Sequence, residues 1–279
     1  MATTSVVSDD EVEQFWDDGV LCLRGLFTDW VAPMRRAVDE ILGTPGPLSI
    51  DLGTGAGEQQ HVRDRFYIEL GLWERHAWFR SLATESPAVE IADRLLRSKA
   101  VHLFFDQLFV KEPGSDQQRT PWHQDQPYWP IRGNDVISVW VTADRVTPQT
   151  GALRYVRGSH RWDDWYRPYT FGSVTQPVRG IEGSEIPDID AEPERYEFLT
   201  WDLEPGDCLV HHGRAIHGGP GNASPDQRRR AYSIRYVGDD VRWDPRPGVL
   251  DNITVMTTKP ITLQAGDVIG GESFPRVRG

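Results

Sequence analysis

Cysteine, long apolar runs and positive charge are all scarce in this chain of 279 residues. The two cysteines, Cys22 and Cys208, lie in different apolar segments and provide no disulfide framework, so we expect both to be small buried residues. No apolar stretch approaches the roughly 20 residues that span a bilayer. Residues 1–10 turn acidic before any signal-like apolar region develops. These absences predict a cytoplasmic protein with no membrane-spanning segment.

The shortage of positive charge bears on possible partners. The chain has 30 Lys and Arg residues against 42 Asp and Glu residues, which gives a formal net charge of −12. This acidic balance argues against nucleic acid as a partner and does not favour a polyanionic acyl-CoA substrate, although local arginines can override the average. We therefore expect a small-molecule substrate, and no feature of the sequence indicates an obligate protein partner.

The length favours a single domain, because all-β barrels of this size commonly form one domain with one large core. Its N-terminal part, about residues 8–98, is predicted to be largely helical. Local signals place a helix start at the capping box of Ser8 and Glu11, a strand at Val20–Leu23, and helices over Asp29–Leu42 and Pro87–Arg97.

The pattern changes after residue 100. Short β-like runs separated by Gly, Pro and Asp are typical of a sandwich or barrel, whose core is expected at about residues 100–240. An aromatic and acidic insert at about 162–193 has no clear period, and such a segment in a compact domain is more often a lid than a filler. Residues 241–279, with Pro245, Pro247 and Pro260, are predicted to form an extended tail.

The tetrapeptide Trp122-His123-Gln124-Asp125 carries the most informative side chains. In an extended strand, residues i and i+2 point the same way, so His123 and Asp125 are expected to reach one metal ion from the same side, with Pro127 ending the strand. Two imidazoles and one carboxylate can occupy one face of an octahedral ferrous ion and leave the other face open for an oxidant and a co-substrate. The second imidazole is expected at His217, where a short apolar strand runs into a glycine-rich loop.

Further motifs follow one another in a characteristic order: Lys111-Glu112-Pro113, Tyr128-Trp129, Trp140, Gly151-Ala152-Leu153, Gly158-Ser159-His160, Asn222 and Arg229-Arg230-Ala231. Together with the His-Asp-His set, from about residue 10 to about residue 245, this pattern resembles the phytanoyl-CoA dioxygenase family. The resemblance implies a mainly β fold with flanking helices, the double-stranded β-helix (jelly-roll, cupin-like). It also implies iron(II) as the cofactor, with 2-oxoglutarate and O2 as co-substrates.

Residue by residue, the resemblance implies that His123, Asp125 and His217 are the iron ligands and the catalytic centre. His211 and His212 compete for the distal position. We prefer His217, because it is followed by the Gly-Gly-Pro-Gly-Asn loop that the family places after its ligand. The other two histidines are expected either to support the ligands or to have a purely structural, buried role.

The co-substrate needs a fixed cation for its far carboxylate, and a guanidinium matches a carboxylate with two parallel hydrogen bonds. Alternation along the predicted strand separates Arg229 from Arg228 and Arg230. We choose Arg229, which shares its face with the small residues Ala231 and Ser233, and keep Arg228 as the runner-up.

Family position also implies that Trp140 and Gln107 line the co-substrate pocket, although a core role for Trp140 is the alternative. Gly219 departs from the pattern, since many relatives carry a hydroxyl residue there. Tyr128 and Trp129 follow the ligand pair and are expected to contact the substrate.

The reaction that the resemblance implies is the oxidation, by default the hydroxylation, of an unactivated C–H group, with release of succinate and CO2. Aromatic residues crowd the start of the insert, so we expect a small to medium-sized, largely apolar substrate from secondary metabolism. A non-oxidative, isomerase-like metal cupin and a catalytically silent ligand-binding jelly-roll are the alternatives.

Overall fold

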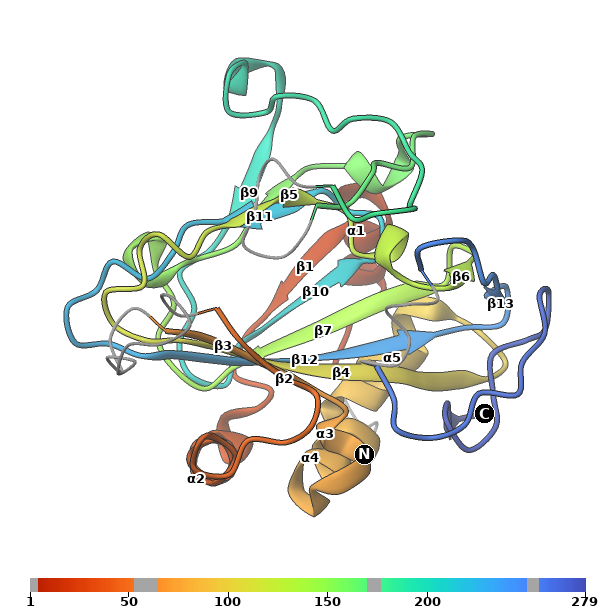
Figure 1. Cartoon of the computed structure of the whole chain (residues 1–279), viewed down its shortest axis with the longest axis horizontal. Helices are drawn as coiled ribbons and strands as arrows, with labels where there is room; N and C mark the ends of the chain where they lie inside the picture. The colour runs from red at the N-terminus through yellow and green to blue at the C-terminus, as the bar shows by residue number, and fades with distance from the viewer. Residues whose placement is uncertain (1–4, 53–64, 170–176, 250–255) are drawn as a thin grey trace.

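The computed structural model of the chain describes residues 5–52, 65–169, 177–249 and 256–279. Its centre is an antiparallel sheet of eight strands that faces a smaller antiparallel sheet of four strands (Figure 1). Helices α2, α3 and α4 lie on the side of the larger sheet that is turned away from the smaller one. The predicted fold class, a mainly β jelly-roll with flanking helices, is confirmed.

The larger sheet has the strand order β1-β10-β7-β12-β4-β3-β2, and β14 pairs with the start of β4. Its strands are β1 (Val20–Leu23), β2 (Ser49–Asp51), β3 (Phe66–Leu70), β4 (Val101–Lys111), β7 (Val136–Thr142), β10 (Cys208–His212), β12 (Arg229–Val237) and β14 (Arg276–Arg278). The strand predicted at Val20–Leu23 is found with the same bounds.

The smaller sheet has the order β5-β11-β8-β9, and a separate pair joins β13 to β6. These strands are β5 (Thr120–His123), β6 (Ile131–Arg132), β8 (Arg154–Val156), β9 (Phe198–Thr200), β11 (His217–Gly219) and β13 (Arg242–Trp243). All six strands are short, with two to four residues each.

Five α-helices and four short 3-10 helices complete the described part of the chain. The α-helices are α1 (Asp9–Asp18), α2 (Thr28–Gly43), α3 (Leu72–Arg75), α4 (Ala77–Glu85) and α5 (Pro87–Leu96). The 3-10 helices are η1 (Gln126–Tyr128), η2 (Pro148–Thr150), η3 (Ser159–Arg161) and η4 (Pro193–Arg195). The three predicted helices are confirmed within a few residues, whereas α3 and α4 were not predicted.

Alternation along the strands of the larger sheet gives it two different faces. One set of residues, which includes Val139, Val141 and Ile234, packs against the helices in a core cluster with Phe15 and Phe79. Burying a Val, Leu or Phe side chain contributes about 1.5–3 kcal/mol, so this outer face supplies much of the stability. The intervening residues face the smaller sheet, and there apolar side chains such as Trp140 and Leu209 are mixed with polar ones such as Arg229.

The start of α1 is built as the sequence predicts. The hydroxyl of Ser8 accepts a hydrogen bond from the backbone N–H of Glu11 at 3.3 Å, and the Glu11 carboxylate accepts one from the Ser8 N–H at 2.7 Å. The helix ends at Gly19, whose φ of 80° is left-handed and whose N–H donates to the Phe15 carbonyl. The carbonyl of Gly19 in turn accepts from the N–H of His212.

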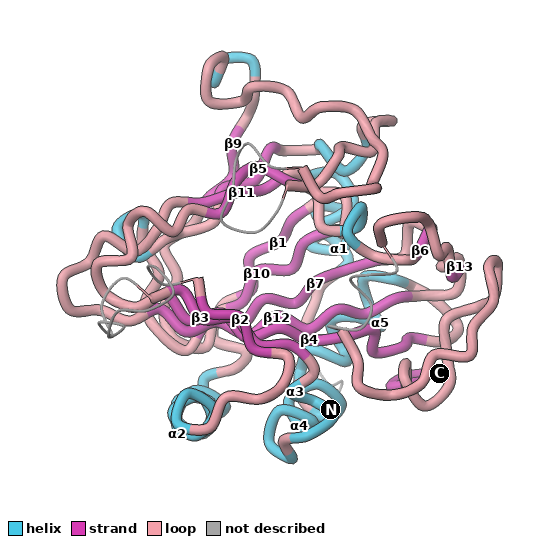
Figure 2. The backbone as a smooth tube through the Cα atoms, in the orientation of Figure 1, coloured by secondary structure: helices cyan, strands magenta, loops and turns pink. Residues whose placement is uncertain are grey.

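The predicted insert runs over the outside of the smaller sheet, and Figure 2 draws most of it as loop. Its residues 170–176 lie outside the described part. Tyr166 packs with Val156 and Ile216, which anchors the insert to the sheet. The predicted tail contributes Trp243 and Phe274 to a second core cluster and ends in β14.

The two cysteines are both free, and Cys208 is buried as predicted while Cys22 is half-buried. Among the described residues, no helix has the length and apolar character that crossing a bilayer requires.

We predict that Gly19→Ala destabilises the protein much more than Gly266→Ala. Both glycines have left-handed φ values, 80° and 90°, so each alanine should cost about 1–2 kcal/mol. A Cβ on Gly19 would lie 2.4 Å from Nδ1 of His160, whereas nothing lies within 4 Å of one on Gly266. Overpacking should therefore add about 1–3 kcal/mol at Gly19 alone. Urea unfolding measures the difference, and equal losses would contradict it.

Candidate functional site

A cavity lies between the two sheets. Its wall combines charged, aromatic and hydroxyl side chains from both sheets: Phe66, Gln107, Phe109, Thr120, His123, Asp125, Trp140, Leu153, His211, His217, Arg229, Ser233 and Arg235. Six of the eight residues predicted from the sequence to form the site are in this set.

His123, Asp125 and His217 converge at one point of this wall. One ligand atom from each residue lies within 4.8 Å of the other two. Nε2 of His123 is 3.3 Å from Oδ1 of Asp125, and Nε2 of His217 is 3.9 Å from the same oxygen. All three residues are at least nine-tenths buried, so the cluster is sheltered from bulk water.

Strand pairing brings the two histidines together. In the pairing of β11 with β5, His217 stands directly opposite His123, and their ring centroids are 4.2 Å apart. Nδ1 of His123 faces the Pro121 carbonyl at 2.8 Å, and Nδ1 of His217 faces the Ala215 carbonyl at 3.0 Å. A carbonyl only accepts hydrogen bonds, so each Nδ1 carries the proton and each Nε2 keeps its lone pair for a metal ion.

Asp125 corrects one prediction. The sequence predicts an extended strand through both His123 and Asp125, but β5 ends at His123, and Asp125 has helical backbone angles of φ −73° and ψ −46°. The chain turns at this point because the next residue, Gln126, donates its N–H to Gly213 and begins η1, which contains Pro127. Asp125 reaches the cluster from a turn and not by strand alternation.

The two oxygens of Asp125 have different surroundings. Oδ1 faces the two histidines described above, whereas Oδ2 is 3.3 Å from the Ser138 hydroxyl, 3.3 Å from Nε2 of His211 and 3.9 Å from Nη2 of Arg235. Donors from β7, β10 and β12 therefore hold one oxygen and leave the other for a metal ion. Burial opposes ionisation of Asp125, but the hydrogen bond from His211 and the positive charge of Arg235 favour it, and the pKa of the carboxyl lies well below its usual value.

The competing histidines have other partners. His211 donates from Nε2 to Asp125, so its Nδ1 is free to accept from the Tyr155 hydroxyl at 3.2 Å. His212 points away from the cluster, because its Nε2 bonds to the Asn134 carbonyl and its Nδ1 accepts from the N–H of Arg214. Burial lowers the pKa of His211 and of His217, which favours neutral imidazoles around the carboxylate.

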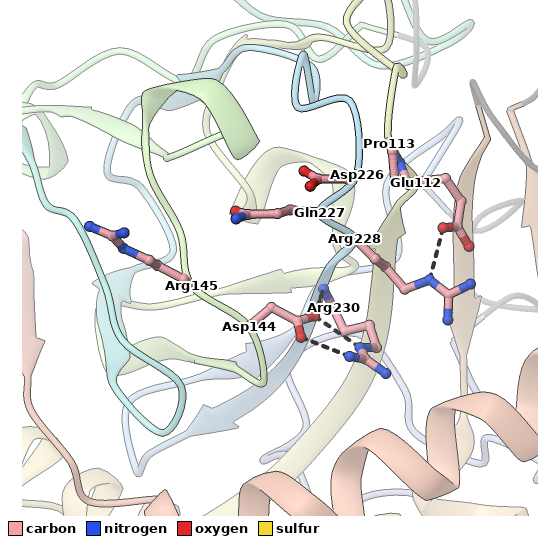
Figure 3. A pocket seen from close by; sticks show the side chains of 8 residues that line it. All are labelled: Glu112, Pro113, Asp144, Arg145, Asp226, Gln227, Arg228 and Arg230. Atoms are coloured by element: carbon pink, nitrogen blue, oxygen red, sulfur yellow. Dashed lines mark hydrogen bonds and ion pairs between the residues drawn. The ribbon is translucent and has the colours of Figure 1, made fainter.

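Alternation separates the three consecutive arginines as predicted. Arg228 bonds to Glu112 at 2.8 Å, and Arg230 forms a fork with both oxygens of Asp144 at 2.9 and 2.8 Å, on the outer side of β12 (Figure 3). These two arginines line a separate surface pocket whose charges are paired.

Arg229 points into the cavity and has different surroundings. It is 2% exposed, its guanidinium lies 5.4 Å from the centroid of the Trp140 ring, and its Nε has no hydrogen-bond partner. Burial lowers its pKa to about 10. A buried guanidinium without an acceptor is costly, which makes Arg229 the cation of this wall that is available to an anionic ligand.

Gln107 also lies in the cavity wall, where its carbonyl oxygen accepts from Arg235 at 3.0 Å. Arg235 was not predicted as a site residue. Extending the alternation from Arg229 through Ser233 would have placed Arg235 on the same face. Ser138 was missed as well, because its role depends on the position of Asp125.

Of the two aromatic residues after the ligand pair, Tyr128 is the nearer to the cluster. Its ring centroid is 6.0 Å from that of His123, and its hydroxyl donates to the Tyr169 carbonyl of the insert at 2.6 Å. Trp129 is 3% exposed and packs edge-on against Phe104 and Phe105 in the core. A substrate contact of Trp129 stays a prediction.

Gln124 joins the ligand pair to the insert. Its carbonyl oxygen accepts from the N–H of Tyr166 at 3.1 Å, and its amide donates to the Asp164 carbonyl at 3.4 Å. Gln124 is 1% exposed. The residue between two candidate ligands therefore fixes the start of the insert against the end of β5 and the turn that follows it.

The chain is similar in sequence to a known protein family and to several curated proteins. The family model for phytanoyl-CoA dioxygenase matches residues 15–231. The chain is 23% identical over 202 residues to "Dioxygenase aneA" of Aspergillus aculeatus, a match that covers 68% of this chain and 60% of that protein. Matches to two further curated relatives cover 52% and 39% of their length, so the chain spans about half the length of these relatives.

Two solved structures of enzymes from nogalamycin biosynthesis have a similar fold. The non-heme alpha ketoglutarate dependent epimerase SnoN is 22% identical with a TM-score of 0.75, and the alignment covers 97% of this chain and 98% of that one. The non-heme alpha ketoglutarate dependent carbocyclase SnoK is 24% identical with a TM-score of 0.73, and the alignment covers 99% of both chains. At these identities the likeness concerns the fold.

We predict that His123→Ala or His217→Ala weakens Fe(II) binding more than about 100-fold, since two protein ligands remain and loss of an outer partner alone typically costs 10- to 100-fold. His211→Ala should fall in that smaller range, and His76→Ala, on the surface beside Glu40, should have no effect. Anaerobic calorimetry measures the affinities. The ligand assignment is wrong if His217→Ala retains tight binding while His211→Ala or His212→Ala abolishes it.

Proposed function

Because the chain belongs to the phytanoyl-CoA dioxygenase family, we propose that it is an iron(II)- and 2-oxoglutarate-dependent oxygenase. The observation that carries the proposal is the convergence of His123, Asp125 and His217 on one wall of a cavity that also contains the Arg229 guanidinium, whose Nε has no hydrogen-bond partner in the described part of the chain. A metal site and an anion site thus share one sheltered space.

The two imidazoles and the carboxylate fit a ferrous ion. Both Nε2 atoms are free of protons and face Oδ1 of Asp125, and the opposite oxygen is held by other donors. A ferrous ion held by these residues would supply, with 2-oxoglutarate and O2, the oxidant for an unactivated C–H group, and 2-oxoglutarate would be converted to succinate and CO2. The protein holds the ligands in place, orients the co-substrate and excludes water.

Arg229 is proposed to bind the far carboxylate of 2-oxoglutarate, with Trp140 and Gln107 forming part of the pocket wall. The face of the Trp140 ring lies 5.4 Å from the guanidinium carbon and limits where that group can move. Arg228, the alternative from the sequence, is engaged by Glu112 and Asp39 at 2.8 and 3.1 Å.

Hydroxylation of a small to medium-sized, largely apolar molecule of secondary metabolism is proposed as the reaction. The aromatic ring of Tyr128 beside His123 and the insert that Tyr128 holds support this substrate class. The enzymes of similar fold from nogalamycin biosynthesis support the metabolic setting, and their epimerase and carbocyclase names mark outcomes that a different substrate pose would give.

The proposal is tested by the conversion of 2-oxoglutarate to succinate. Purified protein with Fe(II), ascorbate and O2 is expected to form succinate, faster with a substrate found by screening small apolar molecules, and a chelator should stop the reaction. A non-oxidative metal cupin would need no 2-oxoglutarate. Failure to form succinate with any substrate, despite tight Fe(II) binding, would exclude the oxygenase.

We predict that Arg229→Ala weakens 2-oxoglutarate binding by about 30- to 150-fold. The change removes a charge-assisted, two-bond contact worth roughly 2–3 kcal/mol. Arg228→Ala and Arg230→Ala serve as matched controls, because their carboxylate partners lie on the outer face, and both should change the affinity little. Similar small effects at all three positions would refute the assignment.

We predict that replacing Trp165 and Tyr169 together with alanine weakens substrate-coupled turnover. The Trp165 ring lies within 5.1 Å of Arg132 and 4.7 Å of Arg246, so it fixes the insert to β6 and to the segment after β13. Binding of Fe(II) and of 2-oxoglutarate should remain unchanged and provides the internal control. Unchanged coupled turnover in the double variant would show that the insert does not act as a lid.

A further inference from the structure

Lys111 is a buried lysine that the proposed chemistry leaves unexplained. It is 1% exposed and is one of three lysines in the sequence, of which Lys99 is exposed. Its ammonium donates to the Pro220 carbonyl at 2.9 Å and lies 3.4 Å from the Thr120 hydroxyl. Both partners are neutral, although a buried ammonium is normally paired with a carboxylate.

The strand register places Lys111 next to residues that line the cavity. It stands opposite Arg229 of β12 on one side and opposite Phe66 of β3 on the other. By alternation it shares a face of β4 with Gln107 and Phe109, which line the cavity. Its ammonium lies 4.8 Å from the centroid of the Phe66 ring, which is also part of the cavity wall. The ammonium therefore lies beside Arg229.

In the described part of the chain, no carboxylate lies within 4.0 Å of the Lys111 ammonium or the Arg229 guanidinium. Two acidic side chains, Glu112 next to Lys111 in the sequence and Asp144, whose charge acts on Arg229, are engaged by Arg228 and Arg230 on the outer face. Burial and the charge of Arg229 hold the pKa of Lys111 well below its usual value. Two adjacent buried cations repel each other, and an anion between them would offset that cost.

We propose that Lys111 is a second cation of the co-substrate site, so that its ammonium and the Arg229 guanidinium together hold the far carboxylate of a bound dicarboxylic 2-oxo acid. This inference rests on the proposed function. The guanidinium supplies a flat pair of donors, and the ammonium supplies a compact charge from the neighbouring strand. A 2-oxo acid without the far carboxylate would leave both cations unpaired.

The test compares two acids of equal chain length, 2-oxoglutarate and 2-oxopentanoate, which lacks the far carboxylate. Their binding to the Mn(II)-loaded protein is measured by calorimetry for wild type, Lys111→Met, Lys111→Gln and the exposed-site control Lys99→Met. Loss of a hydrogen bond to a charged group should weaken 2-oxoglutarate binding by about 10- to 100-fold in both Lys111 variants. Binding of 2-oxopentanoate, and both affinities of Lys99→Met, should not change.

Methionine and glutamine both remove the charge while filling most of the space, and unchanged Mn(II) affinity shows that the site is folded. Equal losses for the two acids would make Lys111 a structural residue and overturn the proposal, as would unchanged 2-oxoglutarate affinity. If wild type binds neither acid, the proposed function fails and the inference fails with it. If wild type binds 2-oxoglutarate and neither Lys111 substitution changes that affinity, the inference is overturned but the proposed function is not.

Discussion

The pairing of β11 with β5 is the contact on which the site depends. It sets His217 opposite His123 across neighbouring strands, and the carbonyls of Ala215 and Pro121 fix the ring orientation of each histidine. A shift of one residue in this register would turn one imidazole to the other face of the smaller sheet. The metal geometry is therefore a consequence of backbone pairing, which two short strands of three and four residues provide.

The larger sheet supplies the other half of the site by keeping unlike side chains on opposite faces. Its outer face is mostly apolar and is covered by the helices, although the buried carboxylate of Asp106 accepts hydrogen bonds there from Trp73 and Tyr232. On the inner face, Ser138, His211 and Arg235 hold one oxygen of Asp125. The same alternation places Lys111 and Arg229 side by side, where an anionic ligand would balance their charge.

Hydrogen bonds connect the insert to the residues beside the candidate metal ligands. Gln124 bonds to backbone groups on both sides of Trp165, and Tyr128 bonds to the Tyr169 carbonyl, so both contacts originate within three residues of Asp125. Any movement of the insert on substrate binding would therefore displace the turn that carries the Asp125 carboxylate. This connection gives the lid proposal a physical basis beyond the aromatic composition of the insert.

Much of this organisation could be predicted from the sequence, because it depends on local signals. The capping box at Ser8, the alternation that isolates Arg229 and the candidate ligand set are all present in short stretches of residues. The turn at Asp125 could not be predicted, since it depends on a hydrogen bond from Gln126 to Gly213, a residue distant in the chain. The support from Arg235 and the position of Lys111 beside Arg229 also required the register between strands. Spacing along the chain determines which side chains share a face, but only tertiary pairing determines which faces meet.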